Sequence, residues 1–354
     1  MNRSDTVGSA RVTVFAPRIA ELLRERRGTG FFRIDGDTVG VADPELINKL
    51  LESRPAHEFE RPTFKPLQGR SIERVEANDV LRAVSHDVRA ALGGPAPDSV
   101  DLSGSWPRTG HAYLRDLLFG PDPLRFRMLT DRRLEKAPVL TRAMVRTSAV
   151  LPGKRALDPP VSRLAAATAT AAAEHGDRRY AMGLYRRVAA PVCLGVAALV
   201  ANALWLGSPF HPDASNRHLV LESLRLLPPS WNILRVASPE FSAVDSRIGP
   251  RDDVLLLPLL THRDPELWPE PDVFLPERWH EVDEDDHPGY IPFGHASDRC
   301  RGRHLIVPLA EHLLERLRAD GLAVNPGQTT ARVPLAGLLG VTRVQVSRTR
   351  LLAT

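Results

Sequence analysis

A proline-dense, aromatic-studded run from Asp264 to Phe293 most constrains how this chain can fold. The run shows neither helical nor strand periodicity, and structureless segments of such length are uncommon inside compact domains and usually serve a function. Large aromatic side chains recur along it, at Trp268, Phe274, Trp279, Tyr290 and Phe293. Side chains of this size favour burial. We therefore expect an irregular segment that is packed against a core and supports a site.

The run leads into a cysteine loop with the sequence Phe293-Gly294-His295-Ala296-Ser297-Asp298-Arg299-Cys300-Arg301-Gly302, which precedes an apolar helix. A thiolate at Cys300 would be stabilised there by backbone N–H groups and by the positive end of the helix dipole. Small residues at 294, 296 and 302 let the backbone curl around the sulfur and let a flat ligand approach closely. Taken alone, the loop also fits an inert cysteine in a turn.

Composition excludes several classes of protein. The 354 residues include two cysteines, Cys193 and Cys300, which are too few for a disulfide scaffold or a zinc site without several histidines. The 47 basic and 43 acidic residues are interleaved and leave a net charge of +4, so we expect no nucleic-acid partner. The first residues do not form a secretory signal, and we expect a cytoplasmic protein.

One apolar stretch, Val188 to Leu206, is interrupted only by Asn202 and reaches the length of about 18 residues at which a membrane span is considered. It is rich in Ala and Gly, contains Pro191 and stands alone in the chain. A helix that is apolar on every face is also typical of the centre of a large helical domain. We therefore expect a buried helix and no membrane partner.

The remaining patterns predict a mainly α protein with a small β region, in a single domain over residues 1–354. A hairpin is expected between Phe31 and Val41, followed by a helix with Asp43 as its N-cap and Pro44 at its first position. The regions expected to be β-rich are about 28–42, 232–262 and 330–350. The helical regions are expected at about 73–228 and 264–325.

Two further motifs stand before the cysteine loop. The first, Glu222-Ser223-Leu224-Arg225, places an acid and a base on one helix face. The second is the string His262-Arg263-Asp264-Pro265-Glu266-Leu267-Trp268-Pro269-Glu270-Pro271-Asp272-Val273-Phe274-Leu275-Pro276-Glu277-Arg278-Trp279. In this order, with the loop around Cys300, they resemble the cytochrome P450 family. The resemblance is strong over about residues 215–325 and suggests a shortened, bacterial-type member with the fold of that family.

The resemblance implies a site. Cys300 would be the catalytic residue and the iron ligand of haem b (iron protoporphyrin IX), and Glu222, Arg225 and Arg278 would form a buried structural triad. Residues expected around the haem are Phe293, Gly294, His295, Ala296, Arg299, Gly302 and, at a propionate, Arg235. Gly195, Val196 and Leu199 would line an apolar substrate pocket. The implied partners are a hydrophobic small-molecule substrate and, where reduction is needed, ferredoxin with its reductase.

The chain also departs from the family pattern. The acid and alcohol that deliver protons in the family fall here on Ala198 and on Leu199 or Val200, which cannot relay a proton. Ala296 stands where Gly is usual, and Asp298 where a basic residue is usual. We therefore expect a monooxygenase-type oxidoreductase of specialised metabolism with an atypical distal helix. The alternatives are a peroxide-driven or non-oxidative haem enzyme, or a degenerate protein that binds haem or recruits a partner.

Overall fold

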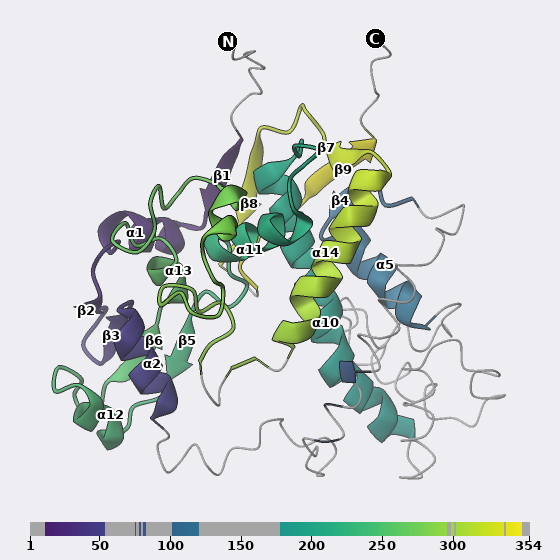
Figure 1. The fold of residues 1–354 in the computed structure, drawn as a ribbon. Helices are drawn as coiled ribbons and strands as arrows, with labels where there is room; N and C mark the ends of the chain where they lie inside the picture. The colour runs from purple at the N-terminus through teal and green to yellow at the C-terminus, as the bar shows by residue number, and fades with distance from the viewer. Residues whose placement is uncertain are drawn as a thin grey trace, which may run out of the picture.

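The computed structural model describes residues 11–53, 75, 78, 81–82, 101–119, 178–295, 299–300, 302–335 and 338–348; of 116–119 and 178–190 it describes only the backbone. Figure 1 shows a group of helices around α10 beside a smaller group of short strands and helices near the N-terminal part of the chain. The expected architecture, mainly α with a small β region, is confirmed.

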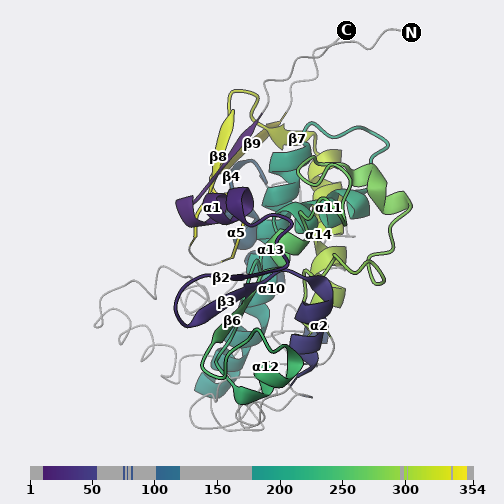
Figure 2. The same ribbon diagram turned by 90° about the vertical axis from the view of Figure 1, so that its left-hand side faces the viewer.

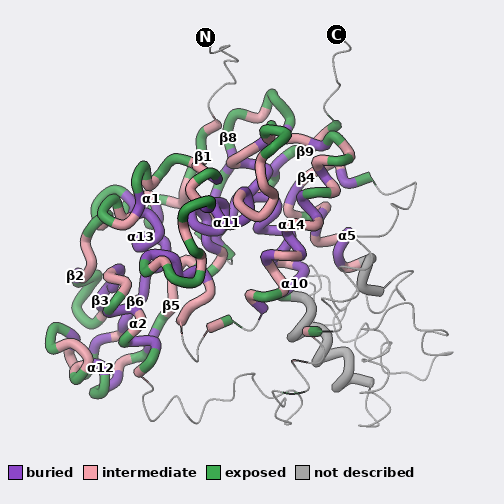
Figure 3. Tube along the Cα trace, in the orientation of Figure 1, coloured by how far each residue is buried: buried purple, intermediate pink, exposed green. Residues whose placement is uncertain are grey.

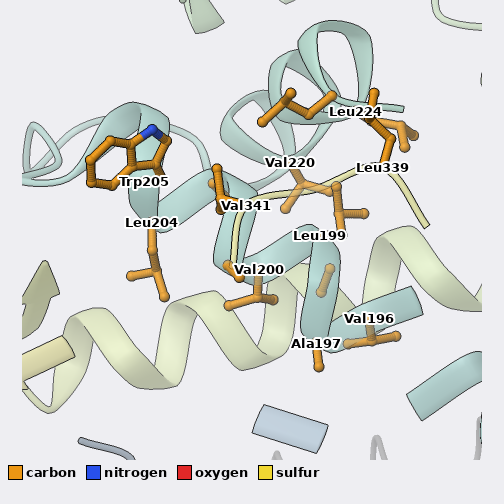
Figure 4. Packing of buried hydrophobic residues seen from close by; sticks show 14 of the residues in the cluster. Val196, Ala197, Leu199, Val200, Leu204, Trp205, Val220, Leu224, Leu339 and Val341 are labelled. Atoms are coloured by element: carbon orange, nitrogen blue, oxygen red, sulfur yellow. The ribbon is translucent and has the colours of Figure 1, made fainter. Parts of the chain in front are cut away.

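The long helix α10 (Arg178–Gly207) is the centre of the helical group. It packs against α5 (Arg108–Phe119), α11 (Asn216–Leu226) and α14 (Arg303–Ala319). Figure 4 shows Leu199 and Val200 of α10 in the same buried cluster as Val220 and Leu224 of α11 and as Leu339 and Val341. Its described half is buried on nearly every side (Figure 3), which explains why the sequence is apolar on every face. The expected buried helix is confirmed.

In the described part of the chain, none of the helices has both the length and the apolar character needed to cross a bilayer.

A four-stranded sheet with the order β2-β3-β6-β5 forms the second group. It consists of β2 (Phe31–Arg33), β3 (Thr38–Val41), β6 (Asp253–Leu256) and β5 (Ile233–Arg235). The predicted hairpin is its antiparallel β2–β3 pair. The helix α2 (Pro44–Glu52) begins as predicted, with Asp43 Oδ1 accepting a hydrogen bond from Leu46 N at 2.7 Å. Figure 2 shows α2 and α12 (Pro239–Val244) beside this sheet.

Two smaller sheets join distant parts of the chain. A parallel pair is formed by β1 (Val12–Phe15) and β8 (Thr330–Val333). A three-stranded sheet has the order β4 (Gly104–Trp106), β9 (Val344–Arg348) and β7 (Leu322–Val324). The described residues also form two short helices, α1 (Pro17–Glu25) and α13 (Pro258–Thr261).

These elements correct several predicted boundaries. The region 232–262 contains the helices α12 and α13 as well as strands, and the helical region 73–228 contains β4. Within 264–325 the part before α14 is irregular apart from the 3-10 helix η1 (Pro276–His280), and β7 follows α14. Residues 83–100 and 120–177 of the predicted helical region lie outside the described residues.

Asn202 is a fully buried polar residue of α10. Its Nδ2 donates to the carbonyl of Leu227 at 3.2 Å, and its Oδ1 accepts from Val341 N at 2.9 Å. One side chain thus satisfies a carbonyl just beyond the end of α11 and an amide of the C-terminal segment. The single amide in an otherwise apolar stretch therefore joins α10 to the end of α11 and to the C-terminal segment that contains Val341.

Replacing Asn202 with Ala is expected to lower the free energy of unfolding by about 2–3 kcal/mol, because it leaves a buried N–H and a buried C=O unpaired. Urea unfolding measures the change. The control is Gln345→Ala on the exposed side of β9, which should stay within about 0.5 kcal/mol of the wild type. If both variants change the free energy of unfolding by the same small amount, the Asn202 hydrogen bonds do not stabilise the core as proposed.

Candidate active site around Cys300

Cys300 lies two residues before the N-cap of α14 and is an exposed free cysteine. Its N–H donates to the carbonyl of Phe293 at 2.7 Å, which closes the loop. Gly294 has a φ of 74°, a conformation that favours glycine, and its N–H donates to the carbonyl of Ile291 at 3.3 Å. A Cβ added at Gly302 would lie 3.7 Å from Cys300 Sγ, so the glycine keeps one flank of the sulfur open. An exposed thiol at a helix start with an open flank fits a thiolate ligand of a flat cofactor.

Charged side chains of the loop and of the first residue of α14 have partners outside the loop. Arg299 Nη2 contacts Asp285 Oδ1 at 2.6 Å, and Arg303 Nη1 lies 3.9 Å from the same oxygen. His295 Nε2 lies 3.0 Å from Glu52 Oε1 at the end of α2. Hydrogen bonding to Arg299 lowers the pKa of Asp285. A small cavity of about 140 Å³ opens beside this cluster, with Tyr290 and Phe293 in its wall.

The predicted triad forms around Glu222, which is fully buried on α11. Its carboxylate accepts hydrogen bonds from Arg225 (2.7 and 3.0 Å), Arg278 Nε (3.2 Å), Leu275 N (3.1 Å) and Trp279 Nε1 (3.0 Å). The three predicted residues are therefore brought together. The indole N–H of Trp279 is a further member that the sequence did not reveal, although its place next to Arg278 in the motif was a signal.

Arg225 explains how the irregular segment is held. Besides its two bonds to Glu222, its guanidinium donates to the carbonyls of His262 (2.7 Å), Pro271 (2.8 Å) and Val273 (3.2 Å). Arg278 Nη1 donates to the carbonyl of Pro269 at 3.0 Å. Buried backbone carbonyls need partners, and here arginine side chains supply them in place of a helix or a sheet. Apart from the short helix η1, the segment is packed without helix or strand, as its aromatic residues predicted.

His262 is a second residue whose part the sequence did not reveal. It is fully buried, and its Nε2 accepts from Ile291 N at 3.0 Å while its Nδ1 lies 3.2 Å from the carbonyl of Arg225. The pKa of His262 is lowered to about 3, first because burial disfavours the imidazolium and then because Arg225 lies beside it. The neutral ring is therefore the native form at neutral pH.

Acidification from pH 6.5 towards pH 3 is expected to lower the free energy of unfolding through His262 by about 1.4 kcal/mol per pH unit. The pKa of His262 is lower in the folded protein than the unfolded value of 6.5. Between the two values the unfolded chain therefore binds a proton at His262 that the native imidazole does not bind. The contribution is intact above pH 6.5 and is lost as the pH falls. Urea unfolding at several pH values measures the slope, and His262→Gln should have a shallower one; equal slopes would contradict the assignment.

The structure places the other predicted residues as follows. Arg235 is buried on β5, where its Nη2 donates to the carbonyl of Ser53 at 2.9 Å. Val196 and Leu199 are fully buried in the core around α10. A Cβ added at Gly195 would lie 3.6 Å from Ile306 Cδ1 on α14, and one at Gly302 would lie 3.5 Å from the same atom. Ala296 lies outside the described residues.

Comparison with known proteins agrees with this geometry. Residues 217–307 match the family described as Cytochrome P450. Cyclooctatin synthase of Streptomyces melanosporofaciens is 38% identical over 91 residues, which are 25% of this chain and 20% of that protein. Cytochrome P450 3A56 of Fundulus heteroclitus is 37% identical over 130 residues, 35% of this chain and 26% of that protein.

Solved structures match over much more of the chain. CYP175A1 from Thermus thermophilus superposes with a TM-score of 0.56 at 20% identity, over 94% of this chain and 95% of that one. The open cytochrome P450 EryK of S. erythraea has a TM-score of 0.54 at 17% identity, over 95% and 96% of the two chains. At such identities the likeness establishes the fold, which is that of cytochromes P450.

Over residues 217–307 the chain is thus similar to the cytochrome P450 family, and its fold is that of cytochromes P450. The segment matched in the curated relatives above covers only a fifth to about a quarter of their length.

Proposed function

We propose that this protein binds haem b through the thiolate of Cys300 and acts as a monooxygenase-type oxidoreductase on a hydrophobic small molecule. The observation that carries the proposal is the exposed Cys300 thiol at the start of α14, at the end of a segment that Glu222, Arg225 and Arg278 pin to the core. Thiolate ligation makes haem iron suited to oxygen activation, and that is the chemistry bound haem would supply.

The chain's own residues would hold the cofactor from two sides. The loop residues with this role are Phe293, Gly294, His295, Ala296, Arg299 and Gly302. Arg299 and His295 now contact Asp285 and Glu52, so they would have to exchange these exposed ion pairs for propionate contacts. Exposed pairs contribute at most about 1 kcal/mol, and the exchange is therefore cheap. Arg235 is proposed for one propionate, in place of its bond to the Ser53 carbonyl.

The substrate is proposed to be apolar because α10 is. Val192 to Trp205 contains no acid and no hydroxyl group, and Val196, Leu199 and Asn202 are fully buried in the core. A substrate that reaches this stretch near Gly195 would therefore meet an apolar surface. Two similar proteins of Streptomyces melanosporofaciens are named cyclooctatin synthase and cyclooctat-9-en-7-ol 5-monooxygenase. A role in specialised metabolism is proposed by analogy with them.

The same stretch favours a second candidate. Without a carboxylate or hydroxyl on Ala198, Leu199 or Val200, this part of α10 cannot hand protons to a reacting oxygen. A peroxide-driven oxidation, which brings its own protons, needs no such relay, and a non-oxidative or non-catalytic use of haem needs none either. Ferredoxin with its reductase is the proposed partner only for the monooxygenase route. A cytoplasmic location remains a prediction.

The first experiment is spectroscopic. The protein, reconstituted with haem, reduced and treated with CO, should show the red-shifted Soret band of thiolate ligation. Absence of haem binding, or an ordinary haem–CO band, would contradict the proposed function. Product formation with hydrogen peroxide is then compared with formation by a ferredoxin system across a panel of apolar substrates. Turnover with peroxide alone favours the second candidate, and turnover with neither supports a non-catalytic role.

A further inference from the structure

His262 connects the C-terminal end of α11 to the segment that enters the cysteine loop. Arg225 is the penultimate residue of α11, so its carbonyl is one of the last four that a helix leaves without a partner. His262 Nδ1 lies 3.2 Å from this carbonyl. On the other side of the ring, Nε2 lies 3.0 Å from Ile291 N. The ring therefore bridges a helix end and the segment that enters the cysteine loop.

The ring's proton is fixed by these contacts. The amide of Ile291 can only donate, so Nε2 must carry a lone pair and Nδ1 must carry the proton, which it donates to the Arg225 carbonyl. A neutral imidazole with one donor and one acceptor is what the two backbone groups need. Burial, which disfavours the imidazolium, maintains this neutral form.

From Ile291 the connection reaches the thiol in two short steps. The carbonyl of Ile291 accepts from Gly294 N at 3.3 Å, which forms the turn after Phe293. The carbonyl of Phe293 then accepts from Cys300 N at 2.7 Å. Both steps are backbone hydrogen bonds, so the described residues between Ile291 and Gly294 connect the Ile291 backbone to that of Cys300.

We propose that His262 is a positioning residue for the Cys300 ligand: its bridge from the Arg225 carbonyl to the Ile291 amide sets where the loop presents the thiolate to haem. The proposal rests on the proposed function. A residue one place before Ile291 offers a matched comparison, because the Tyr290 hydroxyl donates to the Leu221 carbonyl of the same helix at 3.3 Å. Tyr290 ties the same segment to α11 through its side chain, whereas His262 holds the Ile291 backbone itself.

Three variants of the full chain separate the roles. His262→Gln places an amide oxygen where Nε2 was and can still accept from Ile291 N. His262→Asn places its amide where Nδ1 was, so it can donate to the Arg225 carbonyl but leaves Ile291 N unpaired. Tyr290→Phe removes the neighbouring tie. For each, the haem Kd is obtained by titration, the thiolate-ligated fraction from the reduced CO spectrum, and the melting temperature of the haem-free protein by circular dichroism.

We expect haem binding to change in one variant, His262→Asn, and thermal stability alone to change in another, Tyr290→Phe. His262→Asn should bind haem about tenfold more weakly, as for one lost buried hydrogen bond, and should show a reduced thiolate-ligated fraction. His262→Gln should stay within about threefold of the wild type, within the range of a preserved bond. Tyr290→Phe should melt earlier and keep the wild-type spectrum.

Two outcomes would overturn the proposal. If both His262 variants keep the wild-type Kd and the full thiolate band, His262 is only a core residue, whatever their melting temperatures. If Tyr290→Phe loses the thiolate band as His262→Asn does, general loosening of the segment explains both. A wild-type protein without the thiolate band overturns the proposed function and this inference together, which distinguishes the two failures. If His262→Asn does not fold, the thiolate-ligated fraction is compared between His262→Gln and Tyr290→Phe. A larger loss of thiolate ligation in Tyr290→Phe would then contradict the proposal.

Discussion

Glu222→Gln should lower the free energy of unfolding by about 3–5 kcal/mol, because it removes the buried carboxylate that Arg225 and Arg278 contact and leaves these cations without it. The wild-type carboxylate accepts five hydrogen bonds, two of them from Arg225. The amide keeps one acceptor and turns its NH₂ group towards donors. Urea unfolding followed by circular dichroism measures the loss.

The matched control is Glu277→Gln, which removes one carboxylate charge from an exposed position of η1. It should change the free energy of unfolding by no more than about 0.5 kcal/mol. Arg278→Lys is expected to fall between the two, because it keeps the charge but not the planar fork that reaches Glu222 and the Pro269 carbonyl. If Glu222→Gln and Glu277→Gln lower the free energy of unfolding by the same amount, the Glu222 triad does not hold the irregular segment.

The sequence predicted those features that depend on local patterns or on a specific motif. The β2–β3 hairpin, the Asp43 N-cap and the buried α10 each follow from a few neighbouring residues. The Glu222 triad was implied by the resemblance of the two motifs to the cytochrome P450 family. For the hairpin, the N-cap and the buried helix, the evidence lies within the segment itself, so one chain is enough to find it.

Features that depend on distant partners were missed. The strand β1 pairs with β8, with Val12 opposite Thr330, and the three residues of β4 pair with β9. Such short strands have almost no periodicity, and only the partner makes them strands. The same holds for His262, whose importance depends on the Arg225 carbonyl and the Ile291 amide. No pattern in its neighbourhood shows that a backbone group faces each ring nitrogen.

The buried polar residues near the cysteine segment and the apolar side chains of α10 are distributed as the proposed site requires. Glu222, Arg225 and His262 are buried and hold backbone groups of the segment that leads to the cysteine loop. Between Val192 and Trp205 the helix α10 is apolar except for Asn202, whose amide bonds to Leu227 and Val341. The polar groups described there are thus engaged in fixing the fold and the cysteine loop. Chemistry at the site would depend on what Cys300 binds.

Cys300→Ser is therefore expected to remove the thiolate Soret band completely and to weaken haem binding by at least about tenfold, because a serine hydroxyl does not provide the soft anionic ligand of a cysteine. The fold should survive, since Cys300 is exposed and its backbone bond to Phe293 does not need the sulfur. Circular dichroism checks the fold, and the reduced CO spectrum checks the ligand. The control is Cys193→Ala on α10, a thiol whose pKa burial raises to about 12, so that it remains protonated and away from solvent. This variant should keep the thiolate band. An unchanged spectrum in Cys300→Ser, or a band lost only in Cys193→Ala, would show that the iron is held elsewhere.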